Sequence, residues 1–114
     1  MADQTQRIEE IIKRTRIAFI ADTTNKMEQI QSRFQQWEEA HVSQENLIDM
    51  IHRYVHSIKG LALTLHYPLI HHACEQVLAN ILQQENHVWT IFDIKLLQKL
   101  VDDLQISVKT SFAS

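Results

Sequence analysis

The chain has 114 residues, of which 45% are hydrophobic and 22% are charged, as is usual for one globular domain. Its formal net charge of −3 gives no electrostatic reason to expect nucleic acid or an anionic membrane as a partner. A lone cysteine cannot form an internal disulfide, the polar start "MADQTQRIEE" is unlike a signal peptide, and no apolar run approaches the roughly 20 residues that span a bilayer, so we expect a cytoplasmic protein.

Glycine and proline each occur once in the chain. Sheets depend on tight turns that are rich in these residues, so the composition predicts an all-α protein of long helices joined by short links. The patterns described below indicate four amphipathic helices. Four such helices with short links predict an antiparallel four-helix bundle.

The first predicted helix covers about residues 4–39. Its later part carries apolar residues at steps of three and four, with Thr23 in one position of the stripe. The members of this stripe are Ile20, Thr23, Met27, Ile30, Phe34 and Trp37. The earlier part contains Ile8, Ile11, Ile12 and Phe19, and the pattern leaves open whether it forms an additional short N-terminal helix.

The second predicted helix starts after Ser43, a favourable N-cap residue, and runs to about Leu65. Pro68 disfavours a helical conformation at Tyr67 and suits the first turn of a third helix, over about residues 68–84. The apolar stripe of that third helix contains Ile70, Ala73, Cys74, Val77 and Ile81.

The fourth predicted helix starts after Thr90. Asp93 stands at the capping-box position, and Trp89 and Ile94 are spaced for a hydrophobic staple. The stripe alternates steps of three and four residues through Ile94, Leu97, Val101, Leu104 and Val108.

A helical wheel of the second helix, at about 100° per residue, places His56 opposite the predicted core. The predicted core stripe consists of Leu47, Tyr54, Ile58, Leu61 and Leu65. The residues that share the face of His56 are Asp49, His52, Arg53, Lys59, Gly60 and Leu63. We therefore expect His56 to be exposed, with a cation three residues later and a bare backbone four residues later.

This arrangement suits a phosphoryl carrier. An exposed imidazole at neutral pH is a nucleophile, and the Lys59 ammonium can neutralise an anion carried on it. Glycine inside a helix is destabilising, so Gly60 is explained if the missing side chain lets another molecule approach His56. No second catalytic group or glycine-rich phosphate loop is evident, so we do not expect an enzyme.

The segment "HSIKGLALTL" resembles the H-x-x-K-G-x-A motif of histidine-containing phosphotransfer (HPt) domains, matched at His56, Lys59, Gly60 and Ala62. The resemblance implies one such domain over residues 1–114, with a bundle over about residues 16–112. It also implies His56 as phosphoacceptor, Lys59 as its electrostatic helper, and a response-regulator receiver domain or a histidine kinase as partner. The chain itself would need no cofactor, because magnesium would belong to the receiver.

The chain departs from the family pattern at three positions. The family usually has a small residue where Leu61 stands, often a second glycine where His66 stands, and an acidic residue where Leu78 stands. Leu61 is expected at the flank of the core, where it needs compensating space. The glycine that His66 replaces would ease the exit from the helix.

Alternatives remain at the level of the sequence. The chain could be the phosphoacceptor domain of a chemotaxis-type histidine kinase, or a helical interaction module that is never phosphorylated. His52 and His56 could hold a metal, but arginine follows His52 where a zinc protease has glutamate, and no third ligand is evident. We expect no metal site, and we expect His52, Arg53 and Leu63 to contact the partner.

Overall fold

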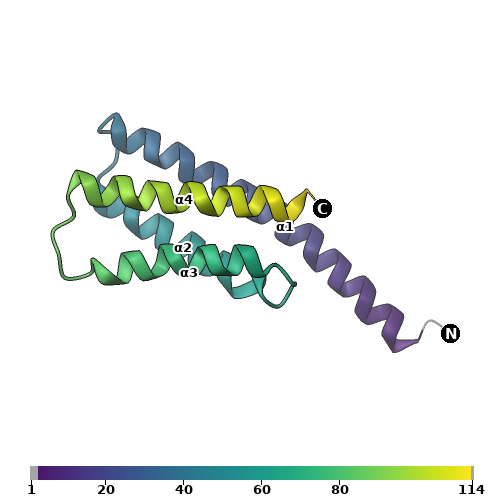
Figure 1. Ribbon diagram of the computed structural model, residues 1–114. Coiled ribbons are helices and arrows are strands. Elements are labelled where there is room, and N and C mark those ends of the chain that lie inside the picture. The colour runs from purple at the N-terminus through teal and green to yellow at the C-terminus, as the bar shows by residue number, and fades with distance from the viewer. Residues whose placement is uncertain (1–2, 114) are drawn as a thin grey trace.

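In a computed structural model, which describes residues 3–113, the chain folds into a bundle of four helices (Figure 1). Helix α1 spans Gln4–Glu38, α2 spans Gln44–Ala62, α3 spans Pro68–Gln83 and α4 spans Ile91–Phe112. Helix α3 packs against α2 and α4, and α1 packs against the same two helices from the other side. The predicted all-α four-helix bundle is therefore confirmed, with α2 and α4 on opposite corners.

One hydrophobic core runs through the bundle. The largest fully buried side chains come from all four helices: Phe34, Met27, Ile30, Leu47, Ile51, Ile58, Ile70, Ile94, Leu97, Leu104, Val55 and Val77. The predicted stripes of the third and fourth helices are buried, apart from Ile81, which is partly buried against the core. Thr23 is fully buried in the stripe of α1, and its hydroxyl has no hydrogen-bond partner.

Side-chain caps fix the starts of three helices. The Asp3 carboxylate accepts a hydrogen bond from the Gln6 N–H at 2.9 Å, and the Ser43 hydroxyl accepts one from the Asn46 N–H at 3.1 Å. Thr90 and Asp93 form the predicted capping box at the start of α4. These bonds satisfy backbone donors that lack a partner within the helix.

Helix α1 is a single continuous helix, so the additional short N-terminal helix is not present. Its first turns project beyond the rest of the bundle, and the molecule measures 60 × 25 × 21 Å (Figure 1). No glycine or proline occurs in this segment, so no residue in it interrupts the hydrogen-bond ladder.

The wheel of α2 is correct for His56 but wrong for Leu61. Leu61 is 46% exposed, whereas Ala62 beside it is fully buried, so Leu61 needs no compensating space in the core. The residues of α2 that are buried are Leu47, Met50, Ile51, Val55, Ile58 and Ala62. The buried arc is turned by about 30° from the predicted one, since a small alanine, rather than the larger leucine, faces the neighbouring helices.

Two helices end with a residue in the left-handed conformation that usually belongs to glycine. Ala40 has φ 60° after α1, and His66 has φ 67° after α2. The Tyr67 N–H bonds to the Ala62 carbonyl and the His66 N–H to the Leu63 carbonyl, which is the Schellman pattern. The regular part of α2 ends at Ala62, and the Schellman turn, which includes a bond from the Leu65 N–H to the Leu61 carbonyl, closes at Leu65, the predicted end. The departure at His66 falls on the strained position of this turn.

Within residues 3–113, no helix is both long enough and apolar enough to cross a membrane.

Candidate functional site

His56 lies on the open face of α2, away from the core. It is exposed, and its ring stacks against that of His52, one turn earlier, with a centroid separation of 6.2 Å and an interplanar angle of 24°. The two rings share one face because they are four residues apart in a helix. The exposure predicted for His56 is confirmed, and its imidazole is accessible to a second molecule.

Lys59 is half-buried on the side of α2 that faces α3. Burial raises the pKa of the Cys74 thiol on α3, and the positive charge of Lys59 opposes this shift. Among the described residues, Lys59 has no hydrogen-bond or ion-pair partner. An ammonium that no carboxylate neutralises, three residues after His56, is available to an incoming anion.

Gly60 leaves an open space on the same face. A Cβ built at this position would meet no atom within 4 Å apart from its chain neighbours and the adjoining backbone of α2, and the residue does not have a positive φ. By contrast, Ala40 and His66 occupy the two positive-φ positions of residues 3–113, where glycine would relieve strain. The only glycine of the chain therefore serves neither a turn nor close packing within the bundle.

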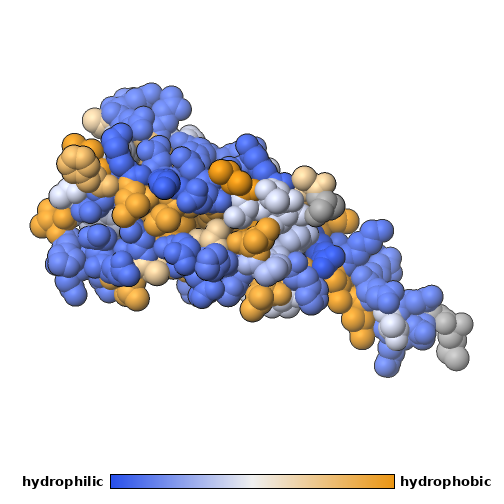
Figure 2. Space-filling view, in the orientation of Figure 1, coloured by the Kyte–Doolittle hydropathy of each residue, from blue (hydrophilic) through white to orange (hydrophobic). Residues whose placement is uncertain are grey.

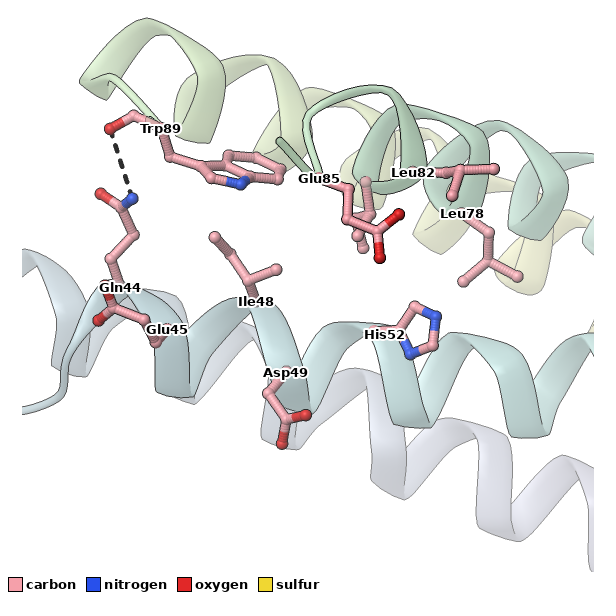
Figure 3. A pocket seen from close by; sticks show the side chains of 10 residues that line it. Gln44, Glu45, Ile48, Asp49, His52, Leu78, Leu82, Glu85 and Trp89 are labelled. Carbon is pink, nitrogen blue, oxygen red and sulfur yellow. Dashed lines mark hydrogen bonds between the residues drawn. The ribbon is translucent and has the colours of Figure 1, made fainter. Parts of the chain in front are cut away.

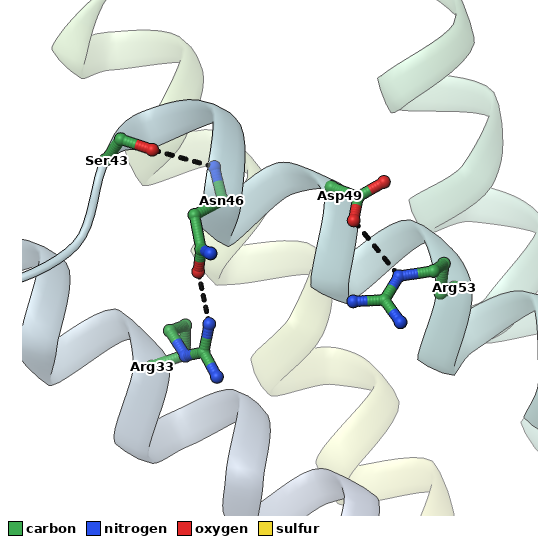
Figure 4. Close-up of polar contacts among 5 residues, drawn as sticks. All are labelled: Arg33, Ser43, Asn46, Asp49 and Arg53. Atoms are coloured by element: carbon green, nitrogen blue, oxygen red, sulfur yellow. Dashed lines mark hydrogen bonds and ion pairs between the residues drawn. The ribbon is translucent and has the colours of Figure 1, made fainter.

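Arg53 and Leu63 complete the exposed surface around His56. The Arg53 Nε donates a hydrogen bond to the Asp49 carboxylate at 3.0 Å (Figure 4). Both side chains are exposed, and the two residues are one helical turn apart. Leu63 is 56% exposed just after the end of α2. All three predicted docking residues, His52, Arg53 and Leu63, are thus accessible from the same side as His56.

The flank of α2 that bears Asn46 and Tyr54 is tied to α1. The Arg33 guanidinium donates to the Asn46 side chain, whose own backbone N–H is capped by Ser43 (Figure 4). Nearer the middle, the Tyr54 hydroxyl donates to Gln29 of α1 at 2.8 Å. These contacts tie α2 to α1, and the buried stripe of α2 keeps the face that carries His56 directed to solvent.

A groove of about 430 Å³ lies between the first half of α2 and the end of α3, and the link between α3 and α4 forms part of its wall (Figure 3). Its apolar lining comes from Ile48, Leu78, Ile81, Leu82 and Trp89, and its carboxylates come from Glu45, Asp49 and Glu85. His52 lines one end, and near the other Gln44 donates a hydrogen bond to the Trp89 carbonyl at 3.4 Å. The departure at Leu78 falls in this groove.

Sequence reasoning missed the groove, because it joins two segments, residues 44–52 and 78–89, that are at least 26 positions apart in the sequence. The available signal was the pair Ile48 and Leu78, apolar residues at the edge of their helical stripes. Trp89 was assigned only to a hydrophobic staple, whereas it is partly buried and also forms one wall of the groove.

No group of three or more histidine, cysteine or acidic side chains that could hold a metal ion occurs in residues 3–113. Burial raises the pKa of the Cys74 thiol to about 12, the charge of Lys59 opposes this shift, and Glu75 adds to it. Cys74 is therefore a neutral core residue at physiological pH.

Comparison with known proteins gives one clear result. The family model described as "Hpt domain" matches residues 14–106, which is most of the chain. The chain therefore belongs to the Hpt domain family, and its role is histidine phosphotransfer in a phosphorelay. No curated protein and no solved structure matches the chain significantly.

Proposed function

We propose that His56 accepts a phosphoryl group from the aspartate of a receiver domain and passes it on to another receiver. The observation that carries this proposal is the open face of α2, where an exposed imidazole, an unpaired ammonium and a bare backbone occur within two turns. The family match supports phosphotransfer in general. Among the seven histidines, His56 alone has Lys59 and Gly60 at the spacing of the motif.

The chemistry assigned to His56 is direct transfer. An unprotonated imidazole nitrogen forms a bond to the phosphorus atom while the bond between phosphorus and the aspartate oxygen breaks, and the carboxylate leaves with the electron pair. Reversal of the same step returns the phosphoryl group to a second receiver. The chain supplies a nucleophile and a fixed surface but no turnover of its own, so it is a carrier and not an enzyme.

Lys59 would stabilise the negative charge of the phosphoryl group from the side of α3. The half-buried stem restricts the motion of the side chain, which keeps the ammonium near the face of His56. Magnesium would be held by the acidic residues of the receiver, and the chain itself would bind no cofactor. Transfer then depends on two cations, one from each partner, placed about the phosphoryl oxygens.

The receiver would dock over α2, on the surface formed by His52, Arg53, Gly60 and Leu63. Leu63 offers apolar contact, and the Arg53 guanidinium is free to exchange Asp49 for a carboxylate on the partner. The groove beside His52 extends this surface toward Trp89. The proposed partners are cytoplasmic proteins, a receiver domain and a histidine kinase, and neither nucleic acid nor a membrane is required.

The test is transfer from a labelled receiver. The full chain is incubated with receiver domains that carry a radioactive aspartyl phosphate, and we expect label that is stable to base and labile to acid. His56→Gln should abolish labelling, whereas His72→Gln, the same change at another exposed histidine, should leave it unchanged. Labelling that persists in folded His56→Gln would overturn the assignment. Failure of a broad panel of receivers to label the wild type would favour an interaction module instead.

A further inference from the structure

The groove between α2 and the end of α3 lies where the apolar surface of the bundle is most exposed. Among the described residues, the three most exposed large apolar side chains all belong to this end: Val88 is 90% exposed, Phe92 is 85% exposed and Leu82 is 68% exposed. Leu82 and Trp89 line the groove itself, and Val88 directly precedes Trp89. Figure 2 shows apolar side chains gathered at the left end of the molecule, where Figure 1 places the link between α3 and α4. An exposed apolar patch of this kind marks a surface that binds another molecule.

The groove is acidic as well as apolar. Within residues 3–113, Glu45, Asp49 and Glu85 line it, and no lysine or arginine does. The Asp49 carboxylate pairs with Arg53, but the carboxylates of Glu45 and Glu85 have no hydrogen-bond or ion-pair partner in the described part of the chain. Figure 3 shows the Glu85 carboxylate directed from the end of α3 toward α2. Two carboxylates of the groove are therefore available to cations of another molecule.

Helical geometry places the groove on the same side of α2 as His56. At about 100° per residue, Glu45 lies about 60° around the helix axis from Ile48, which lines the groove, and Asp49 lies about 100° from it in the same direction. His56 lies at about 80°, between the two carboxylates. Along the axis it is about 10 Å from Asp49 and about 16 Å from Glu45. A protein that docks over His56 therefore also reaches the groove.

The apolar walls and the carboxylates together define the chemistry of the occupant. The carboxylates repel anionic lipid and nucleic acid, and a polyamine offers no large apolar group to the walls formed by Ile48, Leu82 and Trp89. The volume of about 430 Å³ is enough for a few side chains. A protein segment meets all of these conditions when an apolar side chain stands between lysine or arginine side chains.

We propose that the groove binds such a segment on the receiver that docks over His56, and that this contact selects the receiver. The inference rests on the function proposed above, because it takes the receiver as the partner. The apolar side chain packs against Leu82 and Trp89. Its basic neighbours pair with the free carboxylates of Glu45 and Glu85. On the receiver, the segment lies roughly 10–16 Å from the aspartate that exchanges the phosphoryl group.

A peptide library tests the chemistry of the occupant. Short random peptides displayed on phage would be selected on the full chain, and we expect the enriched sequences to combine a large apolar residue with lysine or arginine on both sides. The corresponding synthetic peptides should change the fluorescence of Trp89, measured in Trp37→Phe so that a single tryptophan remains. Enrichment of acidic sequences, or the absence of any enrichment, would overturn the proposal.

Matched variants test whether the enriched peptides bind in the groove. Glu85→Lys should weaken their binding about fivefold, whereas Glu9→Lys, the same charge change at an exposed position of the projecting part of α1, should leave it unchanged. Leu82→Gln should weaken binding about tenfold, and Leu69→Gln is its control, because Leu69 is 56% exposed at the other end of α3. Circular dichroism should show that all four variants are folded. Equal affinity in each variant and its control would overturn the proposal.

Transfer measurements separate this proposal from the role of His56. His56→Gln should lose phosphotransfer but bind the enriched peptides as the wild type does. With a receiver that labels the wild type, Glu85→Lys combined with Leu82→Gln should raise the receiver concentration needed for half-maximal transfer about tenfold. Equal half-maximal concentrations would overturn selection by the groove and leave the role of His56 standing. Peptide binding without labelling by any receiver would contradict phosphotransfer and still support the groove as a docking site.

Discussion

Gly60 is the residue whose presence needs most explanation. The backbone there is ordinary helix, and the space beside it is empty. Glycine at an exposed helical position is about 1 kcal/mol less favourable than alanine. The fold itself therefore gains nothing from glycine at this position, and its role is assigned to what approaches His56 from outside.

Gly60→Ala is expected to raise the free energy of unfolding by up to about 1 kcal/mol, because alanine is the better helix former and its Cβ meets no atom. Gly60→Leu should also fold but should impair phosphotransfer severely, since the branched side chain would fill the space next to His56. Urea unfolding and transfer rates, measured on the same preparations, check both expectations.

The matched control for Gly60→Leu is Lys99→Leu, which places a leucine at an exposed position of α4, the helix diagonal to α2. It should transfer at the wild-type rate. Full activity in folded Gly60→Leu would show that the glycine does not keep space for a partner. Unfolding of Gly60→Ala would mean that this backbone packs against something the structure does not show.

Lys59→Ala should slow transfer on the order of tenfold, because one charge-assisted contact to the phosphoryl group is lost. Lys59→Arg keeps the charge and should recover most of the rate. Single-turnover transfer from a phosphorylated receiver measures the effect, with thermal unfolding as the control for folding. Identical rates in the wild type and Lys59→Ala would mean that Lys59 serves only as surface charge.

At the scale of the helix, the two left-handed C-terminal positions indicate where the fold is under strain. A residue with a Cβ is disfavoured there, whereas glycine adopts the conformation without a clash. Ala40→Gly and His66→Gly should each stabilise the bundle by about 1 kcal/mol, which urea unfolding can measure. Ala21→Gly is the opposite control, since Ala21 lies inside α1 and glycine there should destabilise. Destabilisation by both C-terminal changes would contradict the Schellman assignment.

The starts of the helices could be predicted more accurately than their ends. Ser43 and Thr90 mark their helices because a side-chain oxygen beside an amphipathic run has one evident partner, the free N–H in the next turn. The end of α2 could not be predicted in this way, because histidine occupies the position where glycine would give the signal. A helix end without its usual residue is set by tertiary contacts, and here the Arg16 side chain donates to the Leu65 carbonyl at 3.0 Å.

The geometry of the candidate site was largely predictable, because His56, Lys59 and Gly60 lie on one helix and their relative positions follow from helical geometry. The error at Leu61 has the same origin. A wheel ranks residues by hydrophobicity around one helix, but burial of Ala62 instead of Leu61 depends on how closely the neighbouring helices approach. The groove lies between α2 and the α3–α4 link, so it also required the arrangement of the whole bundle.

At the scale of the molecule, the bundle works as a rigid support for one exposed helix face. Cys74 lies fully buried in the centre of this support, so its thiol reports on opening of the bundle. We expect a thiol reagent to label Cys74 very slowly at pH 8 in the native protein and rapidly in urea. Fast native labelling that is independent of urea would contradict a closed core.

The raised pKa of Cys74 also has a predictable effect on stability. The thiol is neutral in both states below its unfolded pKa of 9.0, and its folded pKa is about 12. Between these values the unfolded state loses the proton and the folded state keeps it, so stability falls as the pH rises through this range. Cys74→Ala should lower the overall stability but remove this part of the pH dependence, which unfolding at pH 8 and pH 10 would show.

If His56 carries the phosphoryl group, the phosphate can be located on that side chain. The wild-type chain, labelled by a phosphorylated receiver, would be kept at neutral to basic pH and fragmented in a mass spectrometer by electron transfer, which leaves phosphohistidine intact. We expect phosphate on His56 and on none of the other six of the seven histidines. Phosphate on His52, on another histidine or on a carboxylate would contradict it.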